Sequence, residues 1–341
     1  MNRVADPHAS DVSIIVVTYN SGEVIEACLG AAAEYIPASE IVVVDNGSTD
    51  QTTSLVTAHP RVRLVAGHGN VGFGAAVNIG AQAATGCLLL VLNPDAVIVS
   101  ISHSGLSELR PELPTGIVGC RIQDTPARHH EPRSVSWGWR GELRWALIEH
   151  FLMPRELNLR RPRLGRPSRP WVAGAAFLVA RDEFLAVGGF DQDFFLYYED
   201  LDLSHAYRSH GLPIRTTDAV TVSHVGGRSS PRDTSTMTGY SLLGLLQYVA
   251  KWEGVSAARH AAGRCLYYLE AIEFVGRNLD FVPALGRRAR AKQTSAARVR
   301  SWLAAAAAQP PMPGAYPNAI EALQFALRER GGANGRLPSP P

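Results

Sequence analysis

The segment 12–17 (VSIIVV) restricts the fold more than any other part of this chain, because it is almost wholly apolar and β-branched. Such a segment predicts a strand buried on both faces of a parallel sheet. Turn residues and a helical stretch to Tyr35 follow it, and a second buried strand is predicted at 40–44. Further strands are predicted near 62–66 and 87–92. Strand and helix alternating in this way predict right-handed βαβ units.

Polar residues follow three of these strands at the point where each strand ends. Asn20 follows the first strand, Asp45 follows the second, and Asp95 follows the fourth. Open α/β sheets bind their ligands at the carboxyl ends of the strands. The sequence therefore predicts a ligand site at this edge.

Charge and cysteine content argue against several protein classes. The 33 basic and 31 acidic residues give a net charge of +2, which does not favour a nucleic-acid-binding protein. Lys251 and Lys292 are the only lysines, so the positive charge is nearly all arginine, which pairs well with phosphate. The four cysteines have no C-x-x-C spacing, which argues against a zinc cluster and fits a reducing cytosol. Neither a signal peptide nor a membrane-spanning helix is predicted.

The pattern changes in the second half of the chain. Residues 154–170 hold six arginines and four prolines and are predicted to form a basic connection. Helices are predicted, by rough pattern, at 240–252, 256–279, 295–308 and 318–330. The predicted domains are a flexible N-terminus (1–11), an α/β domain (12–235), a helical extension (236–330) and a disordered tail (331–341).

Two segments could bind a nucleotide. Asp45 precedes the turn residues 46–48, and its carboxylate can accept the imide N–H of a pyrimidine or can simply form a turn or helix cap. The glycine-rich segment 69–80 permits close approach of backbone to a ligand at a helix N-terminus. It lies in the third βα unit, so it is not a dinucleotide-binding fingerprint.

A possible cation site follows the fourth strand. Asp95, in the triplet Asn93–Asp95, is either a turn former or a ligand of a divalent cation that bridges phosphate oxygens. His224 is a candidate second ligand, although a lone histidine is more often an ordinary polar residue. Arg228 could bind a phosphate or be a solvated loop charge.

An acidic run lies in a predicted helix at 196–210. Its carboxylates Glu199, Asp200 and Asp202 repel one another, so the helix dipole, a cation or a function must offset the repulsion. A solvated acidic helix start is the alternative interpretation. The neighbouring aromatic residues favour partial desolvation, which would suit one carboxylate to act as a general base.

Together these segments resemble the inverting nucleotide-sugar glycosyltransferases of family 2, which have the GT-A fold. The resemblance rests on IIVVTYNS (14–21), VVVDNGSTD (42–50), GNVGFGAAVNIG (69–80), LVLNPD (90–95), WVAGAAFLVAR (171–181), GGFDQDFFLYYEDLDLSHAYRSHG (188–211) and HVGGRSS (224–230). It implies a Rossmann-like, mostly parallel sheet flanked by helices, with a C-terminal helical extension. The G-N-x-G-F-G and N-P-D forms are most similar to bacterial rhamnosyltransferases, which use a dTDP-sugar and build cell-wall or surface polysaccharide.

The resemblance also implies residue roles. Asp200 becomes the catalytic base, supported by Glu199. Asp95 and His224 become ligands of Mn²⁺ or Mg²⁺, while Asn93 replaces the first aspartate of the family's two-carboxylate pattern. The residues implied in nucleotide-sugar binding are Thr18, Tyr19, Asn20, Asp45, Asn70, Asn78, Asn93 and Arg228.

The implied protein is a cytoplasmic, inverting, metal-assisted glycosyltransferase that moves L-rhamnose from dTDP-rhamnose to a glycan or prenyl-diphosphate-linked glycan. Peripheral contact with the inner face of the cell membrane, through the basic residues 155–169 and the amphipathic residues 137–153, is weighed against an exposed acceptor loop. The alternatives are a UDP- or GDP-sugar donor and a non-catalytic binding protein. A nucleotidyltransferase would carry a glycine-rich basic loop after the first strand, where this chain has TYNSGEV.

Overall fold

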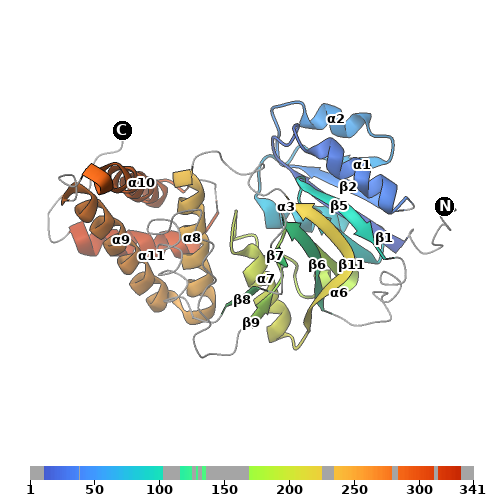
Figure 1. Cartoon of the computed structure of the whole chain (residues 1–341). Coiled ribbons are helices and arrows are strands. Elements are labelled where there is room, and N and C mark those ends of the chain that lie inside the picture. Colours follow the sequence, from blue (N-terminus) through green and yellow to red (C-terminus); the bar gives the residue numbers. More distant parts are fainter. Residues whose placement is uncertain are drawn as a thin grey trace. The chain divides into compact units, whose positions relative to one another are not determined.

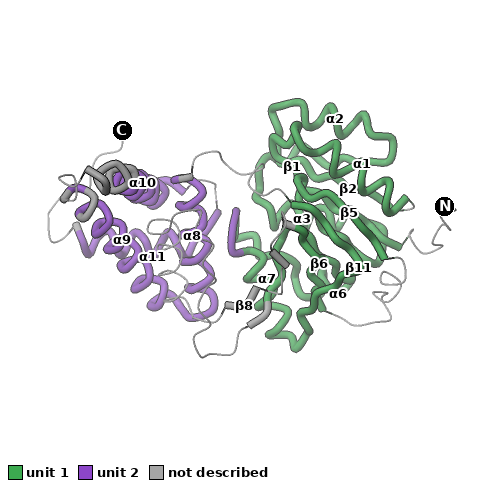
Figure 2. Tube along the Cα trace, in the orientation of Figure 1, with its two compact units in different colours: residues 1–134, 169–195, 199–232 green, residues 135–168, 196–198, 233–341 purple. Residues whose placement is uncertain are grey.

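The computed structural model describes residues 11–37, 39–102, 116–124, 128–129, 133–135, 169–224, 234–278, 283–310 and 314–331. The chain divides into two compact units, which Figure 2 shows in green and purple. Unit 1 comprises residues 1–134, 169–195 and 199–232, and unit 2 comprises residues 135–168, 196–198 and 233–341. The domain limits given above stay a prediction.

Unit 1 is built on a mixed sheet (Figure 1), whose strands follow the order β3-β2-β1-β4-β10-β6-β11-β5, with β7 paired to β6. The strands are β1 (Val12–Thr18), β2 (Glu40–Asp45), β3 (Val62–Val65), β4 (Leu88–Leu92), β5 (Ala96–Ile101), β6 (Ile117–Asp124), β7 (Arg128–His129), β10 (Ala176–Ala180) and β11 (Ile214–His224). A separate two-stranded sheet joins β8 (Arg133–Val135) and β9 (Arg169–Trp171).

The parallel pairing predicted from the sequence holds for β3, β2, β1 and β4. It ends at β10, which runs antiparallel to both of its neighbours, β4 and β6. In the parallel half, the register places Thr18 of β1 beside Asp45 of β2. The carboxyl ends of β2, β1 and β4 therefore meet at one edge of the sheet, as the sequence predicted.

Helices cover both faces of the parallel half. Helix α1 (Ile25–Tyr35) packs on one face, and α3 (Phe73–Ala83) packs on the other with α6 (Arg181–Ala186) and α7 (Glu199–Ser209). The short α2 (Thr52–Ala58) contacts α1 and β3. Because alternate strand residues point to opposite faces, burial on both sides explains the unbroken apolar runs.

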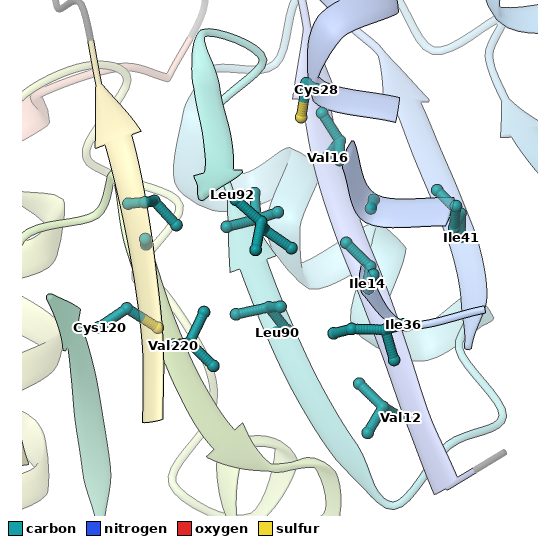
Figure 3. Close-up of a cluster of buried hydrophobic side chains, with 14 of the residues drawn as sticks. Val12, Ile14, Val16, Cys28, Ile36, Ile41, Leu90, Leu92, Cys120 and Val220 are labelled. Carbon is teal, nitrogen blue, oxygen red and sulfur yellow. The ribbon is translucent and has the colours of Figure 1, made fainter. Parts of the chain in front are cut away.

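Figure 3 shows the core on the α1 face. Its labelled residues are Val12, Ile14, Val16, Cys28, Ile36, Ile41, Leu90, Leu92, Cys120 and Val220. Each such fully buried aliphatic side chain stabilises the fold by about 1.5–3 kcal/mol relative to exposure.

Unit 2 contains four long helices among its described residues. They are α8 (Thr234–Glu253), α9 (Val255–Asn278), α10 (Pro283–Ala308) and α11 (Pro317–Gly331). Arg300 of α10 donates two hydrogen bonds to the buried carboxylate of Glu273 in α9, at 2.6 and 3.2 Å. Within the described part of the chain, no helix combines the length and the apolar character that a membrane span requires.

Candidate active site

Asp45 stands at the carboxyl end of β2, and hydrogen bonds from its own surroundings occupy its carboxylate. Its Oδ1 accepts from the hydroxyls of Thr18 at 3.0 Å and Ser48 at 2.5 Å. Its Oδ2 accepts from the backbone N–H groups of Gly47 at 3.1 Å and Ser48 at 2.9 Å. Only 2% of Asp45 is exposed. Four donors fill the usual capacity of a carboxylate, so these bonds support the turn-forming interpretation of Asp45.

Asn46 links this turn to the glycine-rich loop. Its side-chain amide donates to the carbonyl of Gly72 at 3.0 Å, and its Oδ1 lies 3.2 Å from Nε2 of His68. Neither Asn46 nor His68 was predicted to bind a ligand, although Asn46 lies inside one of the quoted motifs. The two side chains add polar groups to the strand-end edge.

Asn20 and Asn70 hold the loops at this edge. Asn20 has a left-handed backbone with φ 49°. Its backbone N–H donates to the Ser48 hydroxyl at 2.9 Å, and its Oδ1 accepts from the Thr49 N–H at 2.8 Å. Asn70 Oδ1 accepts from the Gly72 N–H at 3.2 Å. Both side chains therefore shape the loops that border the predicted nucleotide site.

Asn78 is buried within α3, and its amide is bonded to the main chain of Phe190. Its Nδ2 donates to the Phe190 carbonyl at 2.7 Å, and its Oδ1 accepts from the Phe190 N–H at 2.9 Å. This paired arrangement clamps the segment around residue 190 to α3. The bonds support a structural role for Asn78, and its contact with the donor stays a prediction.

Asp95, which follows β4, and His224, at the end of β11, lie side by side. Oδ1 of Asp95 lies 3.1 Å from Nε2 of His224. The same imidazole nitrogen lies 3.5 Å from Nδ2 of Asn93. Asp95 follows β4, and the antiparallel pairing of β11 with β5 places His224 opposite Ala96. The predicted pair of ligands is thus brought together by strand pairing.

The donor set of this pair fits a divalent cation. Carboxylate oxygen and imidazole nitrogen are both ligands of Mn²⁺-type ions. Ligand bonds of about 2.1 Å at right angles place two neighbouring ligands about 3 Å apart, close to the separation of Asp95 and His224. In the residues that the structure describes, no cluster of three or more His, Cys, Asp or Glu side chains is placed to hold a metal. A cation here would complete its shell with diphosphate oxygens and water, as such ions commonly do at phosphate sites.

A buried thiol lies beside the same turn. Sγ of Cys28 is 3.7 Å from the carbonyl of Asn93. Burial and, to a smaller extent, the Asp95 charge raise the pKa of Cys28 to about 12. Cys28 is therefore a neutral packing residue at neutral pH.

The acidic run forms the first turn of α7, and its carboxylates differ in environment. Asp200 is half-buried; its Oδ2 accepts from the Gly174 N–H at 3.1 Å and its Oδ1 from the Leu201 N–H at 2.8 Å. Glu199 is 7% exposed. Burial, with the charges of Asp200 and Asp202, raises the pKa of Glu199 to about 8. Glu199 is thus mostly protonated at pH 7, while both oxygens of Asp200 accept hydrogen bonds from backbone N–H groups.

Gly174 and Ala175 connect the two acidic parts of the site. The Gly174 N–H binds Asp200, and the carbonyl of Ala175 accepts from the Asn93 N–H at 2.9 Å. These residues lie in the quoted WVAGAAF motif, but no role was predicted for them. Arg228 and the segments 137–153 and 155–168 lie outside the described residues.

Comparisons with known proteins agree with this architecture. Residues 13–158 match the family model described as glycosyl transferase family 2. The chain is 31% identical over 245 residues to N-acetylglucosaminyl-diphospho-decaprenol L-rhamnosyltransferase of Mycobacterium tuberculosis, which covers 64% of this chain and 78% of that protein. It is 27% identical over 246 residues to validoxylamine A glucosyltransferase of Streptomyces hygroscopicus subsp. jinggangensis, covering 62% of this chain and 54% of that one.

A solved structure shows the same fold. The structure of GalNAc-T7 with UDP, GalNAc and Mn²⁺ aligns with a TM-score of 0.52 at 16% identity. The alignment covers 90% of this chain and 59% of that one. The predicted fold class, an α/β sheet flanked by helices with a helical C-terminal part, is confirmed.

Proposed function

This chain belongs to glycosyl transferase family 2, and from that membership we propose that it transfers L-rhamnose from dTDP-rhamnose to a lipid-linked glycan. The family match and the named relatives confirm the predictions of a glycosyltransferase and of a role in glycan synthesis. Membership in this family also disfavours the nucleotidyltransferase alternative. The sugar, the nucleotide and the acceptor are the proposed parts.

The Mycobacterium tuberculosis relative supports the choice of sugar and acceptor. Its name gives L-rhamnose as the transferred sugar and an N-acetylglucosaminyl diphosphate on decaprenol as the acceptor. We therefore propose a prenyl-diphosphate-linked acceptor and a dTDP-linked donor, with a UDP- or GDP-sugar as the alternative. A lipid-linked acceptor would bring the enzyme to the cytoplasmic face of a membrane, so peripheral membrane contact belongs to this proposal.

The environment of Asp200 carries the mechanistic proposal. Inversion is a single displacement at the anomeric carbon, so one base removes the proton of the acceptor hydroxyl. Asp200 is half-buried and fixed through both oxygens, which suits a base that must point at one hydroxyl. Because Glu199 is mostly protonated at neutral pH, it does not compete for the proton and adds little like charge beside Asp200.

Asp95 and His224 are proposed to hold a divalent metal ion on the donor diphosphate. When bound, such an ion stabilises the negative charge that develops on the leaving diphosphate. Asp95 brings a buried carboxylate to the site, and His224 brings an imidazole that is one-fifth exposed. Asn93 lies beside the imidazole and helps to orient it. Arg228 stays a prediction as a further diphosphate contact.

The nucleotide is proposed to lie over the ends of β1 and β2. Thr18, Asn20 and Asn70 shape this part of the edge. Tyr19 offers an exposed ring on which a pyrimidine can stack. Asp45 stabilises the turn that follows β2, and direct contact between Asp45 and the base stays a prediction.

A donor screen tests the proposal. The purified enzyme is incubated with prenyl-diphosphate-linked N-acetylglucosamine and, separately, dTDP-rhamnose, UDP-glucose and GDP-mannose, and products are identified by mass spectrometry. We expect a deoxyhexose to be added from dTDP-rhamnose and no product with Asp200→Asn. Transfer from the UDP- or GDP-sugar alone would refute the donor assignment. Nucleotide binding without any transfer would favour the non-catalytic alternative.

A further inference from the structure

Residues Leu196–Tyr198, called the strap below, lead directly into α7 and its carboxylates Glu199 and Asp200. The strap belongs to unit 2, whereas the residues on both sides of it belong to unit 1 (Figure 2). Tyr197 has φ 68° and Tyr198 has φ 71°. Left-handed backbone is unfavourable for residues with a Cβ, and two in succession persist only where neighbouring contacts hold them.

The hydroxyl of Tyr316 anchors the backbone of the strap. The Leu196 N–H donates to this hydroxyl at 2.7 Å, and the hydroxyl donates to the Leu196 carbonyl. Tyr316 is fully buried and lies immediately before α11. A single side chain therefore satisfies both main-chain polar groups of the first strap residue.

Gly244 of α8 makes room for the rest of the strap. A Cβ at this position would lie 2.5 Å from the carbonyl oxygen of Tyr197 and 3.1 Å from Cδ2 of Tyr198. The ring of Tyr248, one helical turn later, lies 6.3 Å from the ring of Tyr198. Glycine in a helix interior costs stability relative to alanine, so close approach of the strap gives a physical reason for glycine here.

The anchor itself is tied to α8. The side-chain oxygen of the buried Gln247 accepts from the N–H groups of Asn318 and Ala319, both at 3.1 Å. These are N–H groups of the first turn of α11, which need partners outside the helix. The ring of Tyr316 also lies 6.5 Å from that of Tyr240 in α8. Tyr316 is therefore held in place by contacts within unit 2.

We propose that Tyr316 is a positioning residue for Asp200, acting through the strap; this inference rests on the proposed function. The backbone angles of Tyr198 set the direction in which α7 begins. Without the Tyr316 hydroxyl, the left-handed residues relax toward their ordinary conformations and the first turn of α7 moves. Displacement of a catalytic group by about 1 Å can cost a factor of about 100 in rate.

The test compares Tyr316→Phe, which removes one hydroxyl, with Gly244→Ala and a control, Tyr267→Phe. Tyr267 lies on α9 and is 60% exposed, so the loss of its hydroxyl changes a solvated side chain. We measure kcat, the KM for the donor, calorimetric binding of dTDP with Mn²⁺, thermal unfolding, and hydrogen exchange of peptides covering 194–204. We expect Tyr316→Phe to lower kcat about 10- to 100-fold, to leave donor KM and dTDP affinity within about twofold, and to speed exchange at Leu196. Gly244→Ala should act in the same direction, and Tyr267→Phe should match the wild type.

Three outcomes would refute either the inference about Tyr316 or the proposed function. A folded Tyr316→Phe enzyme with wild-type kcat and unchanged exchange at Leu196 refutes the inference. A fall in dTDP affinity and stability that parallels the fall in kcat shows a general structural role and also refutes it. If the wild type transfers no sugar from any donor, but Tyr316→Phe still speeds exchange at Leu196, the anchoring of the strap is supported and the proposed function fails.

Discussion

The imidazole of His224, at the end of β11, lies 3.1 Å from the carboxylate of Asp95, which follows β4. Strands β4 and β11 do not pair with each other. The link is β5, which follows Asp95 in the chain and pairs antiparallel with β11. Strand pairing therefore brings together two side chains that the sequence identifies only as separate candidates.

Asp95→Ala and His224→Ala should both weaken Mn²⁺-dependent binding of dTDP, because each removes one of two proposed protein ligands. Loss of a ligand should also lower kcat by weakening stabilisation of the leaving diphosphate. Calorimetric titration with dTDP, with and without Mn²⁺, measures the first effect. Full activity of the wild type in excess EDTA would rule out a required metal.

Asp200→Asn should lower kcat by a factor of about 10² to 10⁴ and leave donor binding nearly intact, because the base acts on the acceptor. Glu199→Gln is the matched control. Since Glu199 is mostly protonated at pH 7, a neutral amide of the same shape should retain much of the activity. Steady-state kinetics on both variants measure this difference. An active Asp200→Asn with an inactive Glu199→Gln would mean that the roles are reversed.

The raised pKa of Glu199 predicts a dependence of stability on pH. The folded protein holds this proton up to about pH 8, whereas an unfolded chain releases it near the ordinary value of 4.5. Between these values the folded state binds more protons, so the contribution to stability is present at low pH and is lost as pH rises through 8. The free energy of unfolding of the wild type, measured in urea, should therefore fall from pH 5 to pH 8 relative to that of Glu199→Gln. Parallel curves for the two proteins would contradict this prediction.

Asp45→Ala should lower the free energy of unfolding by about 2 kcal/mol, because it leaves the buried Thr18 hydroxyl and the partly buried N–H groups of Gly47 and Ser48 without their acceptor. Urea unfolding measures this loss, and dTDP affinity is measured below the unfolding transition. Affinity within a few-fold of the wild type would agree with a turn-forming Asp45. Unchanged stability with a tenfold or larger loss of dTDP affinity would instead support the predicted contact with the pyrimidine.

Asn78→Ala should destabilise the protein by about 1–3 kcal/mol, because the buried N–H and C=O of Phe190 lose their partners. The KM for the donor should stay within about twofold of the wild-type value. Asn70→Ala, in the glycine-rich loop, is the comparison variant, since it borders the proposed nucleotide site. A large rise in donor KM for Asn78→Ala without loss of stability would restore Asn78 as a donor contact.

Local sequence patterns were sufficient for much of the fold. The apolar runs in β1, β2 and β4 are buried on both faces, and unbroken, β-branched apolar segments of this length predict such burial. The polar residues at strand ends were predictable for the same reason, because parallel strands align their carboxyl ends. The four helices of unit 2 were also predicted, although α8 and α10 begin earlier than their patterns suggested.

Other features depend on contacts between distant parts of the chain. The hydrogen-bond partners of Asp45 and Asn78, which include Thr18 and Phe190, are supplied by other elements of the fold. The helix predicted from Leu196 begins only at Glu199. Its sequence is compatible with helix, but Tyr316 and Gly244 hold the strap in a left-handed path. The sequence by itself determined which residues could bear the chemistry; the tertiary structure decided where they point, because hydrogen bonds and steric limits between remote segments override local conformational preference.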